Sequence, residues 1–245
     1  MNGGYDTVIV FTHGLNCKKN SKNLQTGVVF FSNRSMMRVT TFPTYMKREV
    51  THMKKKIIAI SRQCGSGGYT IGQELAARLG VPFYDKEYLD THAHPDENHV
   101  QSCTSLLFCL TTGMYDGYIL TKGGGTEETS READLIHRLA EQGPCVFVGR
   151  CAEYVLRDRA DCLGVFIQGE KDDRVNRMVT EEKLFPDAAQ RLIESRDKIR
   201  ATHYRNLTNG QIWGDPANYD LVLDSSELGL EACVEQILAA CESCE

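Results

Sequence analysis

Apolar and polar positions alternate along most of the chain in blocks with the lengths of strands and helices. Short apolar runs typical of buried parallel strands are followed by stretches with apolar residues at helical spacing. The predicted strands are KIIAIS, CVFVG, CLGVFIQG and YDLVLDSS. The predicted helices are TIGQELAARL, ADLIHRLAEQG, EKDDRVNRMV, DAAQRLIESRDKIRATHY and ELGLEACVEQILAAC. This alternation predicts an α/β fold, a parallel sheet with helices on both faces.

Glycine and proline stand where several of these helices are expected to begin or end. Gly80 follows the last apolar position of the first helix, where a C-terminal cap belongs. Gly143 stops the second helix, and Pro186 fits the first turn of the long fourth helix. Local turn chemistry therefore agrees with the periodicity.

Residues 1–52 do not share this alternation. The segment LNCKKNSKNLQTG is polar, VVFFSNRSMMRVTTF is briefly strand-like, and no turn chemistry connects them with the rest of the chain. The regular pattern opens at HMKKKIIAIS, which makes Met53 a candidate for the true start. We expect an extended or disordered leader over residues 1–52 and one domain over residues 53–245.

Composition and charge narrow the class of protein. The chain is 41% hydrophobic and 25% charged, as in ordinary soluble domains, and its net charge of -5 argues against nucleic acid as a main partner. No apolar run approaches the 18 or more residues that a membrane helix needs, and no export signal is evident. We expect a cytoplasmic protein whose ten cysteines are mostly reduced core thiols.

The segment ISRQCGSGGYTIG joins the first predicted strand to the first helix through a glycine-rich turn. A helix N-terminus presents unpaired amide N–H groups and the positive end of the helix dipole, so this turn predicts an anion site. At the start of the helix, Thr70 either places its hydroxyl on Mg²⁺ or caps the helix. The predicted phosphate-binding residues are Cys64, Gly65, Ser66, Gly67, Gly68, Tyr69 and Thr70.

Two known phosphate-binding turns fit this segment incompletely. A P-loop carries Lys directly after its last glycine, whereas here Gly68 follows Gly67. A dinucleotide-binding turn would use Gly65 and Gly67, with Asp85 about 20 residues downstream on the ribose, but its third glycine would fall at Thr70. The later arginines would also have no task in hydride transfer, so the dinucleotide alternative is the weaker one.

Three segments together resemble the cytidylate kinase-like family, P-loop relatives of the nucleoside monophosphate kinases. They are KKKIIAISRQCGSGGYTIGQELAARLGVPFYDKEYL, GPCVFVGRCAEYVLRDR and NYDLVLDSSELGLEACVEQI. The resemblance runs from about Met53 to Ile237 and implies a P-loop kinase-like sheet with a short lid. In an alignment with the G-A-G-K-G-T loop of cytidylate kinases, Gly68 stands at the position of the Lys, and Thr70 matches the Thr. The resemblance implies that other members of the cytidylate kinase-like family also lack this Lys.

The resemblance also implies roles for arginines outside the turn. VGRC is similar to the D-G-R-D segment in which Arg grips the acceptor monophosphate, which implies that role for Arg150, although Val148 and Cys151 replace both acids. In SRDKIRA, Asp197 and Arg200 match the Asp and Arg that contact nucleotide substrate, with Arg196 nearby. The predicted substrate-binding residues are Asp85, Arg150, Arg196, Asp197 and Arg200.

Arg174 and Arg177 precede the polar stretch TEEKLF, where the family has its lid. Arginines suit phosphoryl transfer, because it is catalysed mostly by positioning and by neutralising oxygens with forked, permanently charged donors. The alternative for these two residues is a solvated helix face with ordinary ion pairs.

The resemblance also implies that residues 91–129 correspond to a shortened form of the acceptor-binding insert of these kinases. The segment is short and rich in glycine, so the identity of the acceptor stays open. It begins with THAHPDENH, whose residues His92, His94 and His99 form either a metal cluster or, as we expect of most His-rich loops, a solvated loop.

The expected function is Mg²⁺-dependent transfer of the ATP γ-phosphate to a nucleoside monophosphate, cytidylate-like, or to a related small acceptor. Arg62 enters the turn from the strand and is expected to supply the charge of the missing Lys. The predicted catalytic residues are Arg62, Arg150, Arg174 and Arg177. The alternatives are a nucleotide-binding module without catalysis and, more weakly, a dinucleotide-dependent oxidoreductase.

Overall fold

The computed structural model describes Val50 and residues 53–93 and 126–242. Apart from Val50, the expected leader lies outside the described residues, and so do His94 and His99 of the expected insert. Val50 packs against the hydrophobic core, and its carbonyl accepts the N–H of Met53 at 3.1 Å. The packed domain therefore includes Val50, while the boundary at residue 53 stays a prediction.

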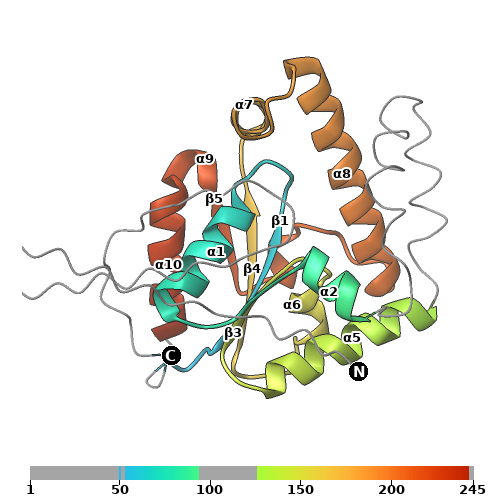
Figure 1. Cartoon of the computed structure of the whole chain (residues 1–245), viewed down its shortest axis with the longest axis vertical. Helices are drawn as coiled ribbons and strands as arrows, with labels where there is room; N and C mark the ends of the chain where they lie inside the picture. Colours follow the sequence, from blue (N-terminus) through green and yellow to red (C-terminus); the bar gives the residue numbers. More distant parts are fainter. Residues whose placement is uncertain (1–49, 51–52, 94–125, 243–245) are drawn as a thin grey trace, which may run out of the picture. The chain divides into compact units, whose positions relative to one another are not determined.

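Five parallel strands form one sheet in the order β2-β3-β1-β4-β5, which confirms the predicted α/β class (Figure 1). The bounds are β1 Ile57–Arg62, β2 Phe83–Asp85, β3 Cys145–Val148, β4 Cys162–Gln168 and β5 Leu221–Asp224. The four predicted strands are β1, β3, β4 and β5, and β2 was not predicted. The central strand β1 pairs through Ile57 with both Cys145 and Cys162, so its carboxyl end lies between the ends of β3 and β4.

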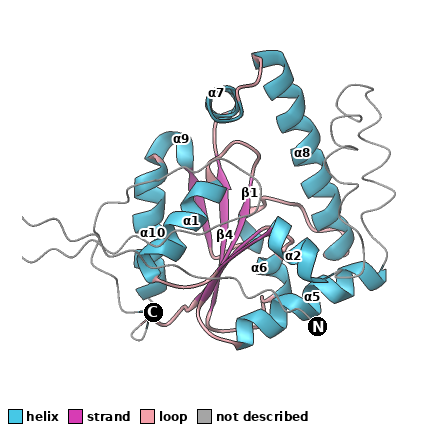
Figure 2. Cartoon of the chain, in the orientation of Figure 1, coloured by secondary structure: helices cyan, strands magenta, loops and turns pink. Residues whose placement is uncertain are grey.

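Helices cover both faces of the sheet (Figure 2). Their bounds are α1 Gly68–Leu79, α2 Lys86–Ala93, α5 Thr126–Glu141, α6 Ala152–Val155, α7 Lys171–Glu182, α8 Pro186–Leu207, α9 Ser225–Leu228 and α10 Leu230–Glu242, with a 3-10 turn over Pro216–Asn218. Gly80 caps α1 in the left-handed conformation, with φ of 65°, and Pro186 opens α8, as predicted. The helices α2 and α6 were not predicted, and the last predicted helix is not continuous, because Gly229 separates the end of α9 from α10.

Alternate residues of β1 point into two separate apolar cores. Ile58 and Ile60 pack in the core shared with α1 and α10. Ile57 and Ala59 pack in the core shared with α2, α5 and α6. This double burial explains why β1 reads as a continuous apolar run rather than an alternating one.

The cysteines of the cores behave as small apolar residues. Cys145, Cys162 and Cys233 are buried free thiols, and burial raises the pKa of Cys145 and of Cys162 to about 12. Such thiols stay protonated and unreactive at physiological pH. These three residues therefore serve packing.

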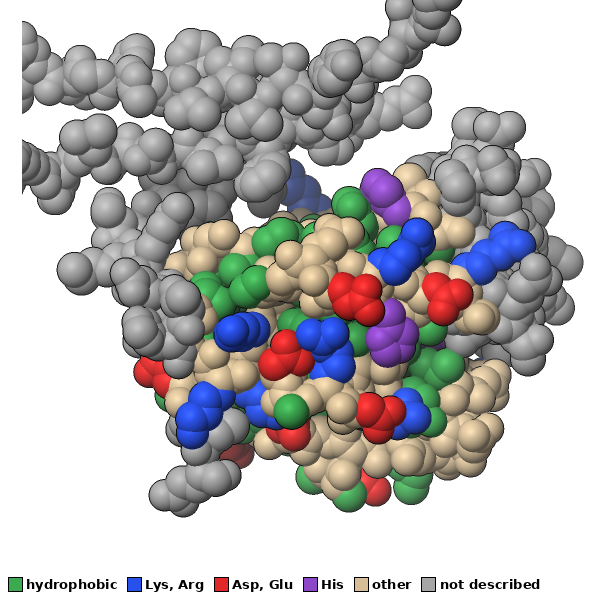
Figure 3. Space-filling view, turned by 90° about the horizontal axis from the view of Figure 1, so that it is seen from below, with side chains coloured by type: hydrophobic (Ala, Val, Ile, Leu, Met, Phe, Trp, Pro, Cys, Tyr) green, Lys and Arg blue, Asp and Glu red, His purple; other side chains and the backbone are tan. Residues whose placement is uncertain are grey.

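None of the helices in the described part of the chain combines the length and apolar character that crossing a membrane requires. Figure 3 shows the molecule from below, where basic, acidic and histidine side chains are interspersed over the described surface. A face of mixed sign lacks the single-signed field that a phosphate-backbone binder presents. The absence of a nucleic-acid partner nevertheless stays a prediction.

Candidate functional site

The turn between β1 and α1 has a shape that favours glycine at two positions. Gly65 and Gly67 have φ of 78° and 79°, in the left-handed region. A Cβ atom on Gly65 would lie 2.7 Å from the backbone oxygen of Arg174, and one on Gly67 would lie 2.5 Å from a methyl carbon of Leu230. Larger side chains are therefore excluded here, and the bare backbone forms the surface of the turn.

This turn brings the amino end of α1 to the carboxyl edge of the sheet. Gly67 caps α1 without any side-chain hydrogen bond, so the amides of residues 68–70 are left for another acceptor. The buried Ser66 braces the turn from inside, because its hydroxyl donates to the carbonyl of Gln63 at 2.9 Å. Unpaired amides at the positive end of a helix dipole suit a phosphate group.

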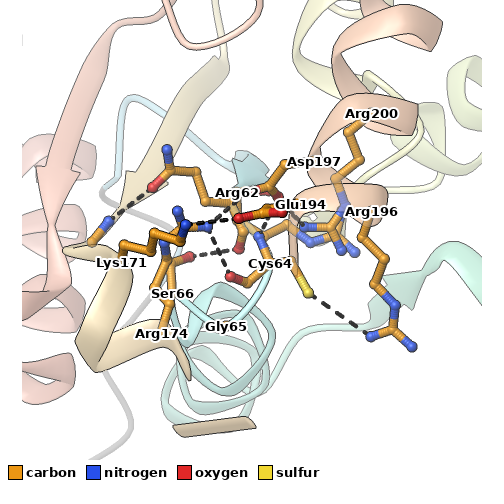
Figure 4. Close-up of polar contacts among 12 residues, drawn as sticks. Arg62, Cys64, Gly65, Ser66, Lys171, Arg174, Glu194, Arg196, Asp197 and Arg200 are labelled. Atoms are coloured by element: carbon orange, nitrogen blue, oxygen red, sulfur yellow. Dashed lines mark hydrogen bonds and ion pairs between the residues drawn. The ribbon is translucent and has the colours of Figure 1, made fainter. Parts of the chain in front are cut away.

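Two arginines of α7 contact backbone carbonyls of the turn. Nη1 of Arg174 donates to the carbonyl of Cys64 at 3.1 Å, and Nη1 of Arg177 donates to the carbonyl of Gly65 at 2.6 Å. Arg174 is buried against the turn (Figure 4). The structure thus brings both predicted lid arginines to the glycine turn, where their partners are main-chain oxygens.

Asp197 of α8 joins the turn to α7. Its Oδ1 accepts the N–H of Cys64 at 2.7 Å, and its Oδ2 accepts Nη1 of Arg174 at 2.6 Å (Figure 4). Arg200 lies 3.9 Å from the same carboxylate. The carboxylate therefore ties three elements together, and the expected contact of Asp197 with a nucleotide stays a prediction.

Arg62, the last residue of β1, occupies the space beside the place of the missing Lys. A Cβ atom on Gly68 would lie 2.6 Å from Cβ and 2.9 Å from Cγ of Arg62, and one on Gly149 would overlap its guanidinium. The side chain thus runs from the start of α1 to the end of β3. Burial, together with the positive charge of Arg200, lowers the pKa of Arg62 to about 9. The group still carries its charge at neutral pH.

Two predicted residues of α8 lie around the same turn (Figure 4). Nη1 of Arg200 donates to the carbonyl of Arg62 at 2.8 Å, and burial lowers the pKa of Arg200. Nη1 of Arg196 lies 3.9 Å from the sulfur of Cys64, a weak contact. The turn is therefore surrounded by positive charge, which the carboxylate of Asp197 balances in part. The arginines that approach it are Arg62, Arg174, Arg177, Arg196 and Arg200.

Arg150 follows β3 and lies on the other side of Arg62, next to Gly149. It has φ of 55° and donates from Nε to Oδ1 of Asp90 at 2.7 Å, with a second contact from Nη2 to the same oxygen. Its Nη2 also lies 3.3 Å from Oε1 of Glu132. Arg150 is thus positioned by acids of α2 and α5 at the carboxyl edge of the sheet.

The surroundings of Arg150 contain residues that sequence reasoning missed. Asp90, Glu132 and His203 come from three separate helices, and nothing in their local sequence points to Arg150. Nε2 of His203 is buried without a hydrogen-bond partner in the described part of the chain. Burial lowers the pKa of His203 to about 4, and the charge of Arg150 adds to the decrease. His203 is therefore neutral at physiological pH.

Asp85 at the end of β2 lies within reach of the start of α1. Its Oδ2 accepts the hydroxyl of Tyr69 at 3.3 Å, and its Oδ1 accepts the N–H of Tyr88 at 2.8 Å. Thr70 is exposed on the first turn of α1. A nucleotide-bound Mg²⁺ needs only one or two protein oxygens besides phosphate and water; the expected roles of Thr70 toward Mg²⁺ and of Asp85 toward the substrate stay predictions.

No group of three metal-binding side chains occurs among the described residues. Of the three histidines in THAHPDENH, only His92 is described, and its ring stacks on Tyr88 with 3.9 Å between the ring centroids. Its Nδ1 lies 2.8 Å from the carbonyl of the same residue. His92 therefore contacts Tyr88 on the exposed surface of α2.

Comparison with known proteins agrees with this geometry. The sequence profile of the cytidylate kinase-like family matches residues 57–227, most of the chain. The chain belongs to the cytidylate kinase-like family. A cytidylate kinase from Pyrobaculum calidifontis is 24% identical over 191 residues, covering 73% of this chain and 88% of that protein. A cytidylate kinase from Pyrobaculum islandicum is 27% identical over 183 residues, with the same coverage.

A solved structure has a similar fold. The crystal structure of an uncharacterized protein from Eubacterium ventriosum has a TM-score of 0.62 and 26% identity, covering 78% of this chain and 99% of that one. Membership of the cytidylate kinase-like family makes this chain a P-loop kinase-like protein for nucleotide kinase-type phosphoryl transfer, with nucleotide substrates. The family also implies ATP and Mg²⁺ as the donor system.

Proposed function

We propose that this chain transfers the γ-phosphate of ATP to a nucleoside monophosphate, cytidylate-like, or to a related small acceptor. The observation that carries the proposal is the pairing of Gly68 with Arg62. The residue that lost the P-loop Lys side chain lies against the stem of a buried arginine that retains its charge at neutral pH. A positive charge on the donor phosphates therefore remains available.

The glycine turn would hold the donor phosphates through its backbone. The first-turn amides of α1 would bind phosphate oxygens, and Arg62 would neutralise the charge that spreads over the transferred group. Arg174 and Arg177 hold the carbonyls of Cys64 and Gly65 and so point the turn's amides toward the ligand. Thr70 would contribute its hydroxyl to Mg²⁺, and the ion, when bound, neutralises charge on the phosphate oxygens.

The acceptor would bind beside Arg150, across Arg62 from the turn. The guanidinium of Arg150 is fixed by Asp90 and Glu132, so an acceptor phosphate would share it with two acids. The same acids could accept hydrogen bonds from hydroxyl groups, such as those of a ribose. Arg196 and Arg200 would add positive charge from α8.

The test is a coupled assay of ADP release with the full chain, ATP and Mg²⁺ across a panel of nucleoside monophosphates, with ATP alone as the background. We expect release above background with at least one pyrimidine monophosphate. Arg150→Met should raise the acceptor KM by roughly 10-fold or more while leaving the ATP KM nearly unchanged, since one charged contact to a phosphate is lost.

A matched control is Arg157→Met, which removes a half-exposed arginine paired with the exposed Asp158. It should behave as wild type. ATP binding without ADP release for any acceptor would contradict the proposal and favour the non-catalytic binding module. Binding of a nicotinamide dinucleotide in place of ATP would favour the oxidoreductase alternative.

A further inference from the structure

Tyr69 is an aromatic residue exposed at the edge of the glycine turn. It is the second residue of α1, and 45% of it is exposed. Its backbone amide is among those left for a phosphate group at the start of the helix, so its side chain begins at the proposed donor site. The shape of the turn depends on Gly65 and Gly67 and does not require a tyrosine at this position. Tyr69 therefore calls for a role of its own.

Packing of α1 on the sheet directs the side chain of Tyr69 toward the end of β2. Gly72, three residues later in α1, approaches the sheet so closely that a Cβ atom on it would lie 2.5 Å from Val148 and 3.1 Å from Phe83. The ring of Tyr69 meets the ring of Phe83 edge to face, with 5.5 Å between the centroids and 86° between the planes. The phenol is thus held along the carboxyl edge of the sheet.

The hydroxyl of Tyr69 donates to a carboxylate that is itself fixed. Oη of Tyr69 lies 3.3 Å from Oδ2 of Asp85, whose Oδ1 accepts the N–H of Tyr88 at 2.8 Å. Burial raises the pKa of Tyr69, and the charge and the hydrogen bond of Asp85 add to the increase. The hydroxyl therefore keeps its proton at neutral pH and needs an adjacent base to act as a nucleophile, which is the place that Asp85 occupies.

The cation proposed for the donor phosphates lies nearby. The Cβ position of Gly68, the residue before Tyr69, is 2.6 Å from Cβ of Arg62, and the charge of Arg62 opposes the increase in the pKa of Tyr69. A hydroxyl, a carboxylate that accepts its hydrogen bond and a cation thus meet at the start of α1. Phosphoryl transfer uses the same three groups as nucleophile, proton acceptor and charge on the transferred oxygens.

We propose that Tyr69 is a self-phosphorylation site, with ATP at the glycine turn as the donor. Oη of Tyr69 forms a bond to the γ-phosphorus, the bond from that phosphorus to the oxygen bridging it to the β-phosphate breaks, and ADP leaves. The phenolic proton passes to Oδ2 of Asp85. The proposal rests on the proposed function for the binding of ATP at the turn, but it needs no acceptor molecule.

The transfer occurs within one molecule, because Tyr69 belongs to the turn that would hold ATP. Phosphoryl transfer is catalysed mainly by alignment of the reacting groups, and the contact with Phe83 restricts where the hydroxyl can lie. The product would carry about −1.5 to −2 charges beside Asp85 and the donor phosphates. Repulsion between these charges should weaken the binding of the next ATP, so phosphorylation of Tyr69 would regulate the donor site.

The test uses the full chain, first treated with a phosphatase and then incubated with ATP and Mg²⁺ without an acceptor. Mass spectrometry of the intact chain should show the addition of one phosphoryl group, and peptide fragmentation should place it on Tyr69. Tyr69→Phe should stay unmodified. The matched control is Tyr88→Phe, because the ring of Tyr88 stacks on His92 and its hydroxyl has no carboxylate partner among the described residues. This variant should be modified like wild type.

The rate of modification tests the roles of the neighbouring groups. Asp85→Asn should slow it by a factor on the order of 10², as for loss of a general base, and Arg62→Ala should slow it by a factor on the order of 10² to 10³. Gly67→Val, which should not bind ATP, should stay unmodified, and its modification would reveal a contaminating kinase and overturn the proposal. A rate per molecule that increases with protein concentration would overturn transfer within one molecule.

The outcomes separate this proposal from the proposed function. A wild type that releases ADP with a monophosphate acceptor but carries no phosphate on Tyr69 would overturn self-phosphorylation and leave the proposed function intact. A wild type that modifies Tyr69 but transfers phosphate to no acceptor would support self-phosphorylation and overturn the proposed function. A wild type whose Tm is not raised by ATP and whose Tyr69 stays unmodified would overturn both.

Discussion

The Cβ position of Gly68 lies 2.6 Å from Cβ of Arg62. No real side chain tolerates such a contact, so residue 68 cannot carry a lysine while Arg62 keeps its place. The space beneath the start of α1 has room for one cationic side chain. In this protein that side chain is Arg62, which enters the space from β1 rather than from α1.

The first prediction is that substitutions at residues 62 and 68 affect each other. Arg62→Ala should lower kcat by a factor on the order of 10² to 10³, comparable to losing one charge-stabilising donor. Gly68→Lys alone should lower stability by about 1–3 kcal/mol, because it overpacks the site. The double mutant Arg62→Gly/Gly68→Lys, which also removes the Cβ atom of residue 62, should recover part of the kcat lost in Arg62→Ala, which a steady-state ADP-release assay measures. A double mutant slower than Arg62→Ala would show that the two residues do not share one task.

The second prediction concerns backbone access to the glycine turn. ATP should raise the Tm of the wild type, since a ligand at a hundredfold excess over its Kd stabilises the native state by about 2.7 kcal/mol. Gly67→Val should abolish this increase, because its side chain would meet Leu230 at the turn. The control is Gly143→Val, which also has positive φ but no neighbouring atom within 4 Å. An ATP-induced increase that survives in Gly67→Val would place the nucleotide elsewhere.

The third prediction concerns Asp197, whose carboxylate serves both the amide of Cys64 and the guanidinium of Arg174. Asp197→Asn should lower the free energy of unfolding by about 3 kcal/mol, because Arg174 would remain buried without its counter-charge. Urea denaturation measures the loss. Asp158→Asn, whose side chain is 86% exposed, should change stability by less than about 0.5 kcal/mol. Equal losses of unfolding free energy for the two substitutions would show that the hydrogen bonds of the Asp197 carboxylate do not stabilise the fold.

The fourth prediction concerns the neutral, buried ring of His203. Its folded pKa is about 4, below the ordinary value of 6.5, so folding excludes the proton. Exclusion of this proton has no effect on the free energy of unfolding above pH 6.5. As pH falls from about 6.5 to about 4, the unfolded state gains the proton and the free energy of unfolding decreases by on the order of 2–3 kcal/mol. His203→Asn should flatten the fall in Tm across this interval. A curve parallel to that of wild type would show that His203 does not titrate in this way.

The sequence was sufficient for the elements whose pattern is local. Four strands are continuous apolar runs, and the glycine turn is visible because its glycines fall at a strand-to-helix junction. Strand β2 was not predicted, because its three residues, Phe83–Asp85, are too few to show a periodic pattern. Arg174 and Arg177 were predicted as site residues from their place before the expected lid. Their partners, the backbone carbonyls of Cys64 and Gly65, were not predicted, because a backbone carbonyl has no sequence signature.

Long-range partners account for the remaining gaps in the candidate site. Arg150 stands at a visible strand end, yet Asp90 lies 60 residues before it in the chain. Glu153, a buried acid of α6, was not singled out from the sequence, because only the packing of α6 against β1 and β4 distinguishes it from a surface acid. Such relationships depend on the strand order, which apolar runs alone do not determine.

The tie between Cys64 and Asp197 spans 133 residues of the chain, and this separation bears on how the protein is made. During synthesis from the N-terminus, the glycines emerge long before α8 does. An interaction of such high sequence separation closes late, after the sheet has brought β1 and β4 together. A nascent chain that ends before α8 would contain every glycine of the turn but lack the carboxylate that holds it in shape, so nucleotide affinity should arise only once α8 has folded.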